Sequence, residues 1–187
     1  MYSEKIEKIL NDLEDKNLEI AGGSVVGMVL STVNSLIKYI ANLTVGKKNY
    51  AEVQDKVLEI LKQADDLKNK SLNSIDKDKE VLEKILITYK KRKEMPEDYQ
   101  MACKEAVEFG IEVLEVAYKT FELSEEISKV GNKMLSSDFK ICKYYAEASI
   151  KSAKENVFIN FESVQDIQFK ERMNQIYLDM VKKYEGE

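Results

Sequence analysis

Three acidic residues lie close together near the middle of the chain, at Asp76, Asp78 and Glu80. Carboxylates at this spacing are expected to raise one another's pKa, which would suit a general acid or base that works near neutral pH. The chain contains no histidine, so proton transfer at that pH depends on Asp, Glu, Lys, Tyr or Cys. The other interpretation of the triplet is a capping cluster on a hydrated surface, and the spacing alone favours it.

The glycine pair Gly22-Gly23 stands directly before Ser24 and a long apolar stretch. Backbone N–H groups at the start of a helix, together with the helix dipole, can bind a carboxylate or another anion. An ordinary tight turn capped by the Ser24 hydroxyl accounts for the same residues. A glycine pair is weakly specific by itself, so both interpretations remain open.

Two polar pairs in the C-terminal half are equally ambiguous. Ser137 and Asp138 stand where a helix is expected to begin and would serve as caps. Asn156 and Asn160 are one helical turn apart near a helix end. Their amides could bind the edge of an amide-like ring, or they could simply cap the helix.

Composition excludes several classes of function. The net charge is −5 and the pI is about 5.1, which argues against a general nucleic-acid binder. The local basic pair Lys47-Lys48 is most simply the solvated end of a helix. Cys103 and Cys142 show no metal-binding or redox spacing, so we expect no disulfide, no metal site and a reducing, cytoplasmic compartment.

The first five residues are charged and show no apolar stretch of the kind found in signal peptides. Residues 24–43 form the one span that resembles a membrane helix. This span includes serine, threonine, asparagine and lysine side chains, too many polar groups for lipid. We therefore expect it to be a helix buried in protein, and we expect no membrane partner.

The elements that must position these residues are predicted to be helices. One proline and seven glycines leave few turn signals, and apolar residues recur at helical spacing. The pattern predicts helices over 3–16, 24–44, 50–72 with a continuation through 81–86, 96–130, 141–157, and a last one that Ser163 to Asp166 cap and that ends near 184. A bend or short break is expected at 74–76, with Asp76 as its cap. The predicted fold is all-α, one compact bundle of about six to eight helices in a single domain over 1–187.

Taken together and in order, the short segments resemble the formimidoyltetrahydrofolate cyclodeaminase and methenyltetrahydrofolate cyclohydrolase family. Its members typically carry a Pro-Gly-Gly-Gly-Ser turn, a Leu-Thr-x-Gly-Lys-Lys segment, an Asp-x-Asp-x-Glu stretch, and Gly-Asn, Ser-Asp and Asn-Val-x-Ile-Asn signatures. The similar segments here are 21–25, 41–50, 75–80, 131–132, 137–138 and 156–160. The resemblance extends over nearly the whole chain with these segments in family order, which is far more specific than any one of them.

The resemblance implies an all-helical enzyme of folate one-carbon metabolism that commonly forms a homodimer. It implies cyclisation of 5-formimidoyltetrahydrofolate to 5,10-methenyltetrahydrofolate with release of ammonia. Folate N10 attacks the formimino carbon at N5, a step that needs proton transfers but no metal or organic cofactor. A chain of this length would be the cyclodeaminase module alone, with a formiminotransferase as a further partner.

The resemblance also suggests roles for individual residues. Without histidine, Asp76 or Asp78 is the candidate acid–base catalyst. The start of the helix at Gly22, Gly23 and Ser24 is expected to hold carboxylate groups of the substrate. The same role is expected of Lys47 and Lys48, whereas the expected pterin-lining and substrate-binding residues are Asp138, Asn156 and Asn160.

Three alternatives remain open at this stage. One is methenyltetrahydrofolate cyclohydrolase activity, in which water attacks the methenyl carbon. Another is a family member that has lost activity and binds folate or a partner protein. This alternative rests on Leu18 to Ala21, which stand where the family has Pro-x-Pro-Gly, and on Gln100 or Met101, which replace a common arginine. The last is a helical assembly protein whose motifs are similar by chance.

Overall fold

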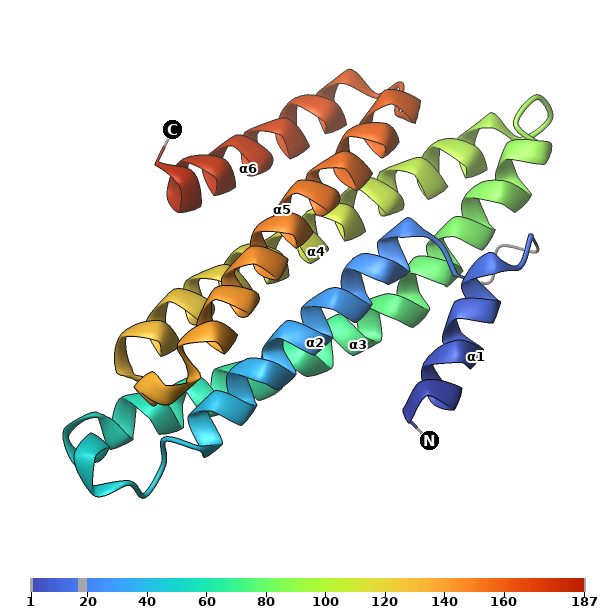
Figure 1. Cartoon of the computed structure of the whole chain (residues 1–187). Coiled ribbons are helices and arrows are strands. Elements are labelled where there is room, and N and C mark those ends of the chain that lie inside the picture. Colours follow the sequence, from blue (N-terminus) through green and yellow to red (C-terminus); the bar gives the residue numbers. More distant parts are fainter. Residues whose placement is uncertain (1, 17–19, 187) are drawn as a thin grey trace.

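The computed structural model describes residues 2–16 and 20–186 of the chain, and within these ranges it contains helices and no strands (Figure 1). The predicted all-α class is confirmed. The α-helices are α1 (Tyr2–Glu14), α2 (Gly22–Asn42), α3 (Gln54–Lys90), α4 (Pro96–Val130), α5 (Ser136–Ser163) and α6 (Ile167–Glu185). Two short 3-10 helices, η1 (Lys48–Val53) and η2 (Lys133–Leu135), lie in the connections after α2 and α4.

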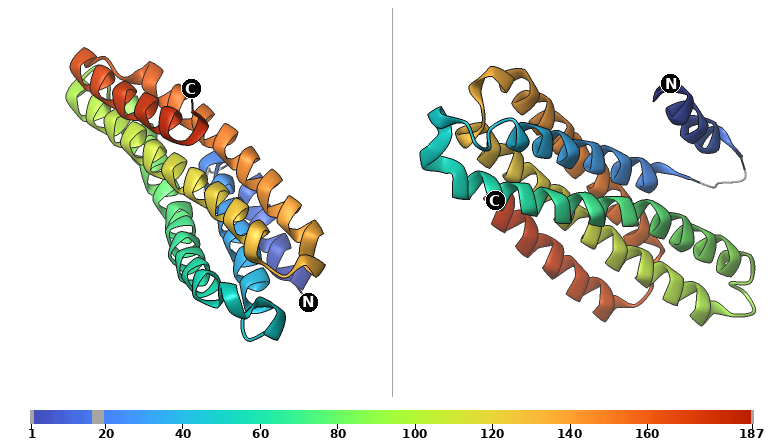
Figure 2. Two further views of the ribbon diagram at one scale, coloured as in Figure 1. Left: turned by 90° about the vertical axis from the view of Figure 1, so that its left-hand side faces the viewer. Right: turned by 90° about the horizontal axis from the view of Figure 1, so that it is seen from below.

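Helices α2 to α5 lie side by side as the bundle, and α6 packs along α4 and α5 (Figures 1 and 2). The core forms because each helix carries apolar residues at alternating spacings of three and four. On α2 the buried stripe consists of Val26, Leu30, Val33, Ile37 and Ile40. This stripe faces α3, α4 and α5 and makes α2 a central helix of the bundle.

Helix α3 runs without interruption from Gln54 to Lys90, so the predicted break at 74–76 and the prediction of Asp76 as a cap are wrong. The polar residue at 74 does not interrupt the helix because the Ser74 hydroxyl donates to the Ser71 carbonyl oxygen, 2.8 Å away. Packing on α2 supports the helix at the same place. Gly27 of α2 lies so close to α3 that an added Cβ would be 2.9 Å from the Ser71 carbonyl oxygen.

Some helices begin and end where the sequence predicts, and others do not. Helix α4 begins at Pro96 and ends just before Gly131, and Asp166 caps α6 by accepting a hydrogen bond of 3.0 Å from the Phe169 N–H, as predicted. The prediction of Ser24 as a cap is wrong, because α2 already begins at Gly22.

The caps predicted at the start of α5 are also wrong. Ser137 and Asp138 lie inside the first turn of α5, which begins at Ser136.

Helix α2 is long and apolar enough to cross a membrane by length and composition alone, and half of its most apolar window is buried inside the protein. That burial agrees with the prediction of a helix packed in protein. Helix α1 differs, since it buries none of its residues and lies apart from the bundle (Figure 2, right). Residues 17–19, which include Leu18 and Glu19 of the expected family turn, lie outside the described ranges.

Candidate active site

The first turn of α2 is joined to the middle of α3 by one carboxylate. The backbone N–H of Ser24 donates to Asp78 Oδ2 at 2.8 Å, and the Ser24 hydroxyl lies at the same distance from this oxygen. Gly23 makes the contact feasible, because a Cβ there would lie 2.6 Å from Asp78 Cγ. The expected carboxylate-binding helix start is therefore present, and a side chain of the protein itself occupies it.

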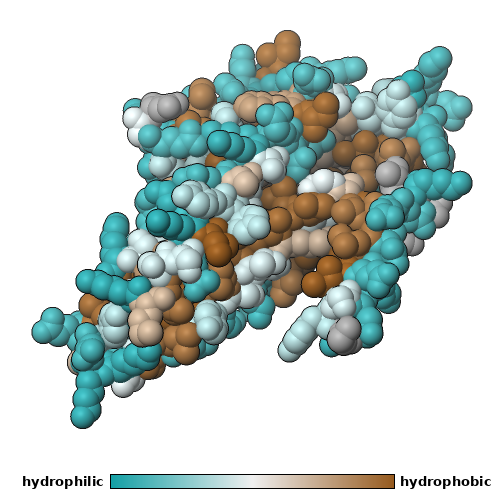
Figure 3. Space-filling view, in the orientation of Figure 1, coloured by the Kyte–Doolittle hydropathy of each residue, from teal (hydrophilic) through white to brown (hydrophobic). Residues whose placement is uncertain are grey.

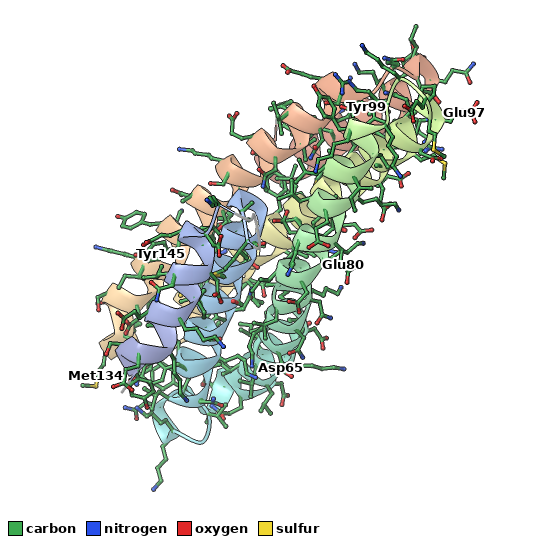
Figure 4. All side chains as sticks on the ribbon, turned by 90° about the vertical axis from the view of Figure 1, so that its right-hand side faces the viewer. Asp65, Glu80, Glu97, Tyr99, Met134 and Tyr145 are labelled. Atoms are coloured by element: carbon green, nitrogen blue, oxygen red, sulfur yellow. The ribbon has the colours of Figure 1, made fainter. Side chains whose placement is uncertain are left out.

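Burial raises the pKa of Asp78 above its usual range, while the hydrogen bonds from Ser24 oppose the shift. The raised pKa was expected, but the expected cause, crowding among the three carboxylates, is wrong. On a continuous helix each residue turns about 100° from the one before, so neighbours two positions away point to other sides. Asp76 and Glu80 are accordingly exposed, and Figure 4 shows Glu80 on the outer side of α3.

Asp78 lies in the wall of a cavity of about 180 Å³ between α2, α3, α4 and α5. The wall is mainly apolar, and its polar side chains are few. The lining residues are Ala21, Gly22, Gly23, Asp78, Val81, Leu82, Ile85, Ala106, Phe109, Gly110, Val113, Ala153, Asn156, Ile159 and Asn160. Sites for small ligands commonly combine an apolar wall with a few converging polar groups in this way.

Asn156 and Asn160 both line the cavity from α5, one helical turn apart. The Asn160 amide nitrogen donates to the Asn156 carbonyl oxygen at 2.8 Å, so this interaction holds the Asn160 side chain against its own helix. Asn156 also borders a second hollow of about 540 Å³, an open groove between α2 and α5. Gly22 and Asn156 line both spaces, so the groove adjoins the cavity.

The structure brings together five of the predicted site residues around this cavity, with Ser24 directly behind Asp78. It does not bring the remaining ones there. Asp76 is not among the lining residues, and Lys47, Lys48 and Asp138 lie at the opposite end of the bundle (Figure 1). Helix α2 alone separates Lys47 from Gly22 by about 30 Å at 1.5 Å per residue.

At the opposite end of the bundle, hydrogen bonds join the connection after α2 to the connection after α4. The backbone N–H of Asn132 donates to the Thr44 hydroxyl at 2.9 Å, and the backbone N–H of Lys133 donates to the Tyr50 hydroxyl at 3.0 Å. These bonds join the connection that carries Lys47 and Lys48 to the start of η2. Figure 4 shows the two ends, with Met134 of η2 at one and Glu97 and Tyr99 of α4 at the other.

Of the positions at which the chain departs from the family motifs, Gln100 lies outside the cavity and Ala21 lines it. Gln100, where an arginine was expected, accepts from the Gln165 N–H at 2.7 Å and donates to the Ser163 carbonyl oxygen at 3.1 Å. It therefore holds the α5–α6 connection. Ala21 precedes the first turn of α2 and lines the cavity.

The apolar wall was not foreseen from the sequence. Phe109, Val113 and Ile85 show the same helical spacing as ordinary core residues, so no local signal distinguishes them. Gly110 lets α4 and α5 lie close together, since a Cβ there would lie 3.1 Å from Val157 Cγ2. Within residues 2–16 and 20–186 no group of three or more His, Cys, Asp or Glu side chains is placed to hold a metal ion.

Comparison with known proteins agrees with this geometry. A family model described as formiminotransferase-cyclodeaminase matches residues 5–177. The methenyltetrahydrofolate cyclohydrolase of Methylorubrum extorquens is 26% identical over 176 residues, which cover 90% of this chain and 85% of that protein. The crystal structure of formiminotetrahydrofolate cyclodeaminase from Thermotoga maritima superposes with a TM-score of 0.88 at 26% identity, covering 96% of this chain and 89% of the other. The chain belongs to the formiminotransferase-cyclodeaminase family.

Proposed function

We propose that the protein is a folate one-carbon enzyme that cyclises 5-formimidoyltetrahydrofolate to 5,10-methenyltetrahydrofolate and releases ammonia. The observation that carries the proposal is the Asp78 carboxyl, half-buried in the apolar cavity and bonded to the start of α2. Family membership and the similarity to a cyclodeaminase of solved structure support the choice of substrate.

The reaction requires one proton to leave N10 and one to reach the departing amine. The formimidoyl group reacts as its protonated form, –CH=NH2+. As N10 attacks its carbon, a C–N bond forms, the C=N double bond becomes a single bond to an NH2 group, and the Asp78 carboxylate accepts the N10 proton. As the tetrahedral intermediate collapses, the bond to the amino nitrogen breaks, and the carboxyl returns the proton so that ammonia leaves. A carboxyl whose pKa is raised by burial can both accept a proton and return it. We propose this role for Asp78 alone, because Asp76 is exposed outside the cavity.

The cavity also suggests how the substrate is held. Its volume of about 180 Å³ suits only part of a folate, and the adjoining groove between α2 and α5 provides room for the remainder. Asn156 and Asn160 would bind the polar edge of the pterin, and the apolar wall would enclose the reacting ring. Holding N10 beside the formimidoyl carbon supplies much of the acceleration, because the ring closure is then a positioned intramolecular step.

A second candidate function is methenyltetrahydrofolate cyclohydrolase activity. It is favoured by the similarity to the Methylorubrum extorquens protein. Water would then attack the methenyl carbon, and Asp78 would accept the proton of that water. The same cavity serves both reactions, since they share the methenyl compound as product or substrate.

Further features of the proposal rest on the resemblance to the family. They are a homodimer, a cytoplasmic location, a formiminotransferase that supplies the substrate, and catalysis without a metal or organic cofactor. The roles of Gly22, Gly23, Ser24, Lys47, Lys48 and Asp138 in binding substrate also stay predictions.

The proposed activity is tested by supplying each folate separately to the purified protein. With 5-formimidoyltetrahydrofolate we expect ammonia and the absorbance of the methenyl product to appear together. Loss of methenyl absorbance in water without ammonia would identify the cyclohydrolase instead. Stabilisation of the protein by reduced folate without either reaction would indicate the folate-binding alternative, and no stabilisation even at millimolar folate would contradict all three.

Replacing Asp78→Asn removes the proton-accepting oxygen while preserving the shape of the side chain. We expect kcat to fall by about 10²-fold or more, the usual contribution of a positioned acid–base group. Asp76→Asn is the matched control, because it makes the same change two residues away on the exposed side of α3 and should leave kcat nearly unchanged. Equal rates for Asp78→Asn and the unmodified protein would exclude Asp78 as the acid–base group.

The glycine pair offers a test of the contact between α2 and α3. Gly23→Ala would displace the Asp78 carboxylate from Ser24, and we expect the free energy of unfolding to fall by about 1.5–3 kcal/mol, the contribution of hydrogen bonds to a charged group. Gly22→Ala is the control, since a Cβ at residue 22 meets nothing within 4 Å. Urea denaturation should show little change or a small gain for Gly22→Ala, and equal behaviour of the two variants would contradict the described contact.

A further inference from the structure

Helix α6 covers the outer side of the α4–α5 pair. Large apolar and aromatic residues at helical spacing form its inward stripe, which consists of Phe169, Met173, Tyr177, Met180 and Tyr184. The first two pack among residues of α4 and α5, and the last three pack against the core cluster that contains Phe109, Val113 and Ala153. The outward surface of α6 is mainly hydrophilic (Figure 3). Since these three cluster residues also line the cavity, α6 supports the cavity wall from behind.

The last residue of α6 joins α4 to α5. The Tyr118 hydroxyl of α4 donates to Glu185 Oε1 at 2.6 Å. Lys154 of α5 donates to both carboxylate oxygens of Glu185, at 2.8 Å and 3.0 Å. The ring of Tyr184 stacks on that of Tyr118, with the centroids 4.7 Å apart and the planes 5° from parallel. One carboxylate at the end of α6 therefore holds two helices of the bundle at once.

The Glu185 contact is better shielded from water than the ion pair between Arg172 of α6 and Glu108 of α4. Tyr118 is 2% exposed, and the side chains of Lys154 and Glu185 are 21% and 30% exposed. Arg172 and Glu108 are 3.6 Å apart, with side chains 64% and 51% exposed, and such a pair contributes little. Burial opposes ionisation of Glu185, but the hydrogen bonds from Lys154 and Tyr118 outweigh it, so the pKa of Glu185 lies below its usual range. Glu185 is therefore ionised and held in place at neutral pH.

We propose that Glu185 is a positioning residue that holds α4 and α5 at the separation the folate cavity requires, a role that rests on the proposed function. The two groups that Glu185 binds stand close to the cavity wall along their own helices. On α4, Tyr118 follows the cavity residue Val113 by five positions, and on α5, Lys154 precedes the cavity residue Asn156 by two. At 1.5 Å per residue, each group is within about 8 Å of a lining residue along the helix axis.

The cavity is sensitive to the separation of α4 and α5. The two helices approach closely at Gly110, where a Cβ would lie 3.1 Å from Val157 Cγ2. The cavity residues Phe109 and Asn156 stand directly before Gly110 and Val157 in the sequence. Movement of α5 away from α4 would therefore withdraw Asn156 from Phe109 and widen the cavity. The contact between α2 and α3 does not restrain this movement, whereas Glu185 does, because it binds both α4 and α5.

Binding of 5-formyltetrahydrofolate, a stable analogue of the proposed substrate, tests this role. In Glu185→Ala we expect its Kd by calorimetry, and the KM for 5-formimidoyltetrahydrofolate, to rise by about fivefold or more, the lower end of coupling between separate sites. The kcat should stay within about twofold, because the Asp78 carboxyl keeps its partners and only binding is weakened. Arg172→Gln is the matched control, since it removes the exposed pair between α6 and α4 and should change neither constant. A lower melting temperature of Glu185→Ala with an unchanged Kd would assign Glu185 to stability alone and overturn the proposal.

Exchange of the two charges provides the rescue control for the same measurement. Lys154→Glu brings two carboxylates together and should raise the Kd as Glu185→Ala does. The double variant Lys154→Glu/Glu185→Lys restores an ion pair, and the Tyr118 hydroxyl can then accept a hydrogen bond from the ammonium group. We expect the Kd of the double variant to return to within about threefold of the unmodified value, because residues in direct contact couple. A double variant that binds no better than the single ones would contradict a role for the contact.

Amide hydrogen exchange locates the effect without any ligand. Glu185→Ala should accelerate exchange over residues 109–118 and 153–160 and leave residues 22–27 and 75–82 unchanged, because α4 and α5 lose their shared contact while α2 and α3 keep theirs. Acceleration over the whole chain, or in α6 alone, would overturn the proposal. If the unmodified protein neither binds the analogue nor turns over folate, the proposed function is refuted, and the exchange result then decides whether Glu185 holds the cavity wall.

Discussion

The contact between the first turn of α2 and the middle of α3 is the constraint on which the candidate site depends. The Asp78 carboxylate binds Ser24 at the start of α2, and Gly23 and Gly27 allow the two helices to lie close enough for that bond. A side chain at either glycine would separate them. The contact places Asp78 beside the start of α2, and the packing of α4 on α3 and of α5 on α2 and α4 brings in the residues that complete the cavity.

The same contact controls the protonation of Asp78 through opposing effects. Burial favours the neutral carboxyl, whereas the Ser24 hydrogen bonds and the positive end of α2 favour the carboxylate. Burial is the larger effect, so the pKa is raised. A carboxyl held fully ionised could not return a proton, and one held fully neutral could not accept one. The balance at Asp78 therefore matters for chemistry as well as for stability.

The long periodic segments and the clear stop signals of the sequence predicted the fold. Pro96 and Gly131 bound α4, and Asp166 caps α6, because these residues act through local backbone chemistry. Segment 74–76 is continuous helix although Ser74 and Asp76 suggest a break, because the Ser74 hydroxyl bonds within the helix and Gly27 brings α2 against it. Such packing cannot be read from the local sequence.

The arrangement of Asp76, Asp78 and Glu80 depends on whether α3 is broken at residue 76. With a break at residue 76, the three carboxylates could gather at one point, but on a continuous helix Asp78 points to another side than Asp76 and Glu80. Burial, which depends on α2, α4 and α5, then distinguishes Asp78 from its neighbours. Phe109 and Val113 of the cavity wall could not be identified either, because a residue that lines a cavity and one that fills a core have the same periodicity.

The order of signature segments along a chain does not show whether they meet within one copy of it. Here Gly22-Gly23 begin α2 and Lys47-Lys48 follow its end at Asn42, so the length of the helix keeps the two pairs apart. A role for the lysines in the structure of their own end is already filled by Thr44, Tyr50 and Asn132. Within one copy of the chain, Lys47 and Lys48 therefore lie too far from the cavity to contact a ligand held there. The rigidity of α2 is what keeps these two signature segments apart.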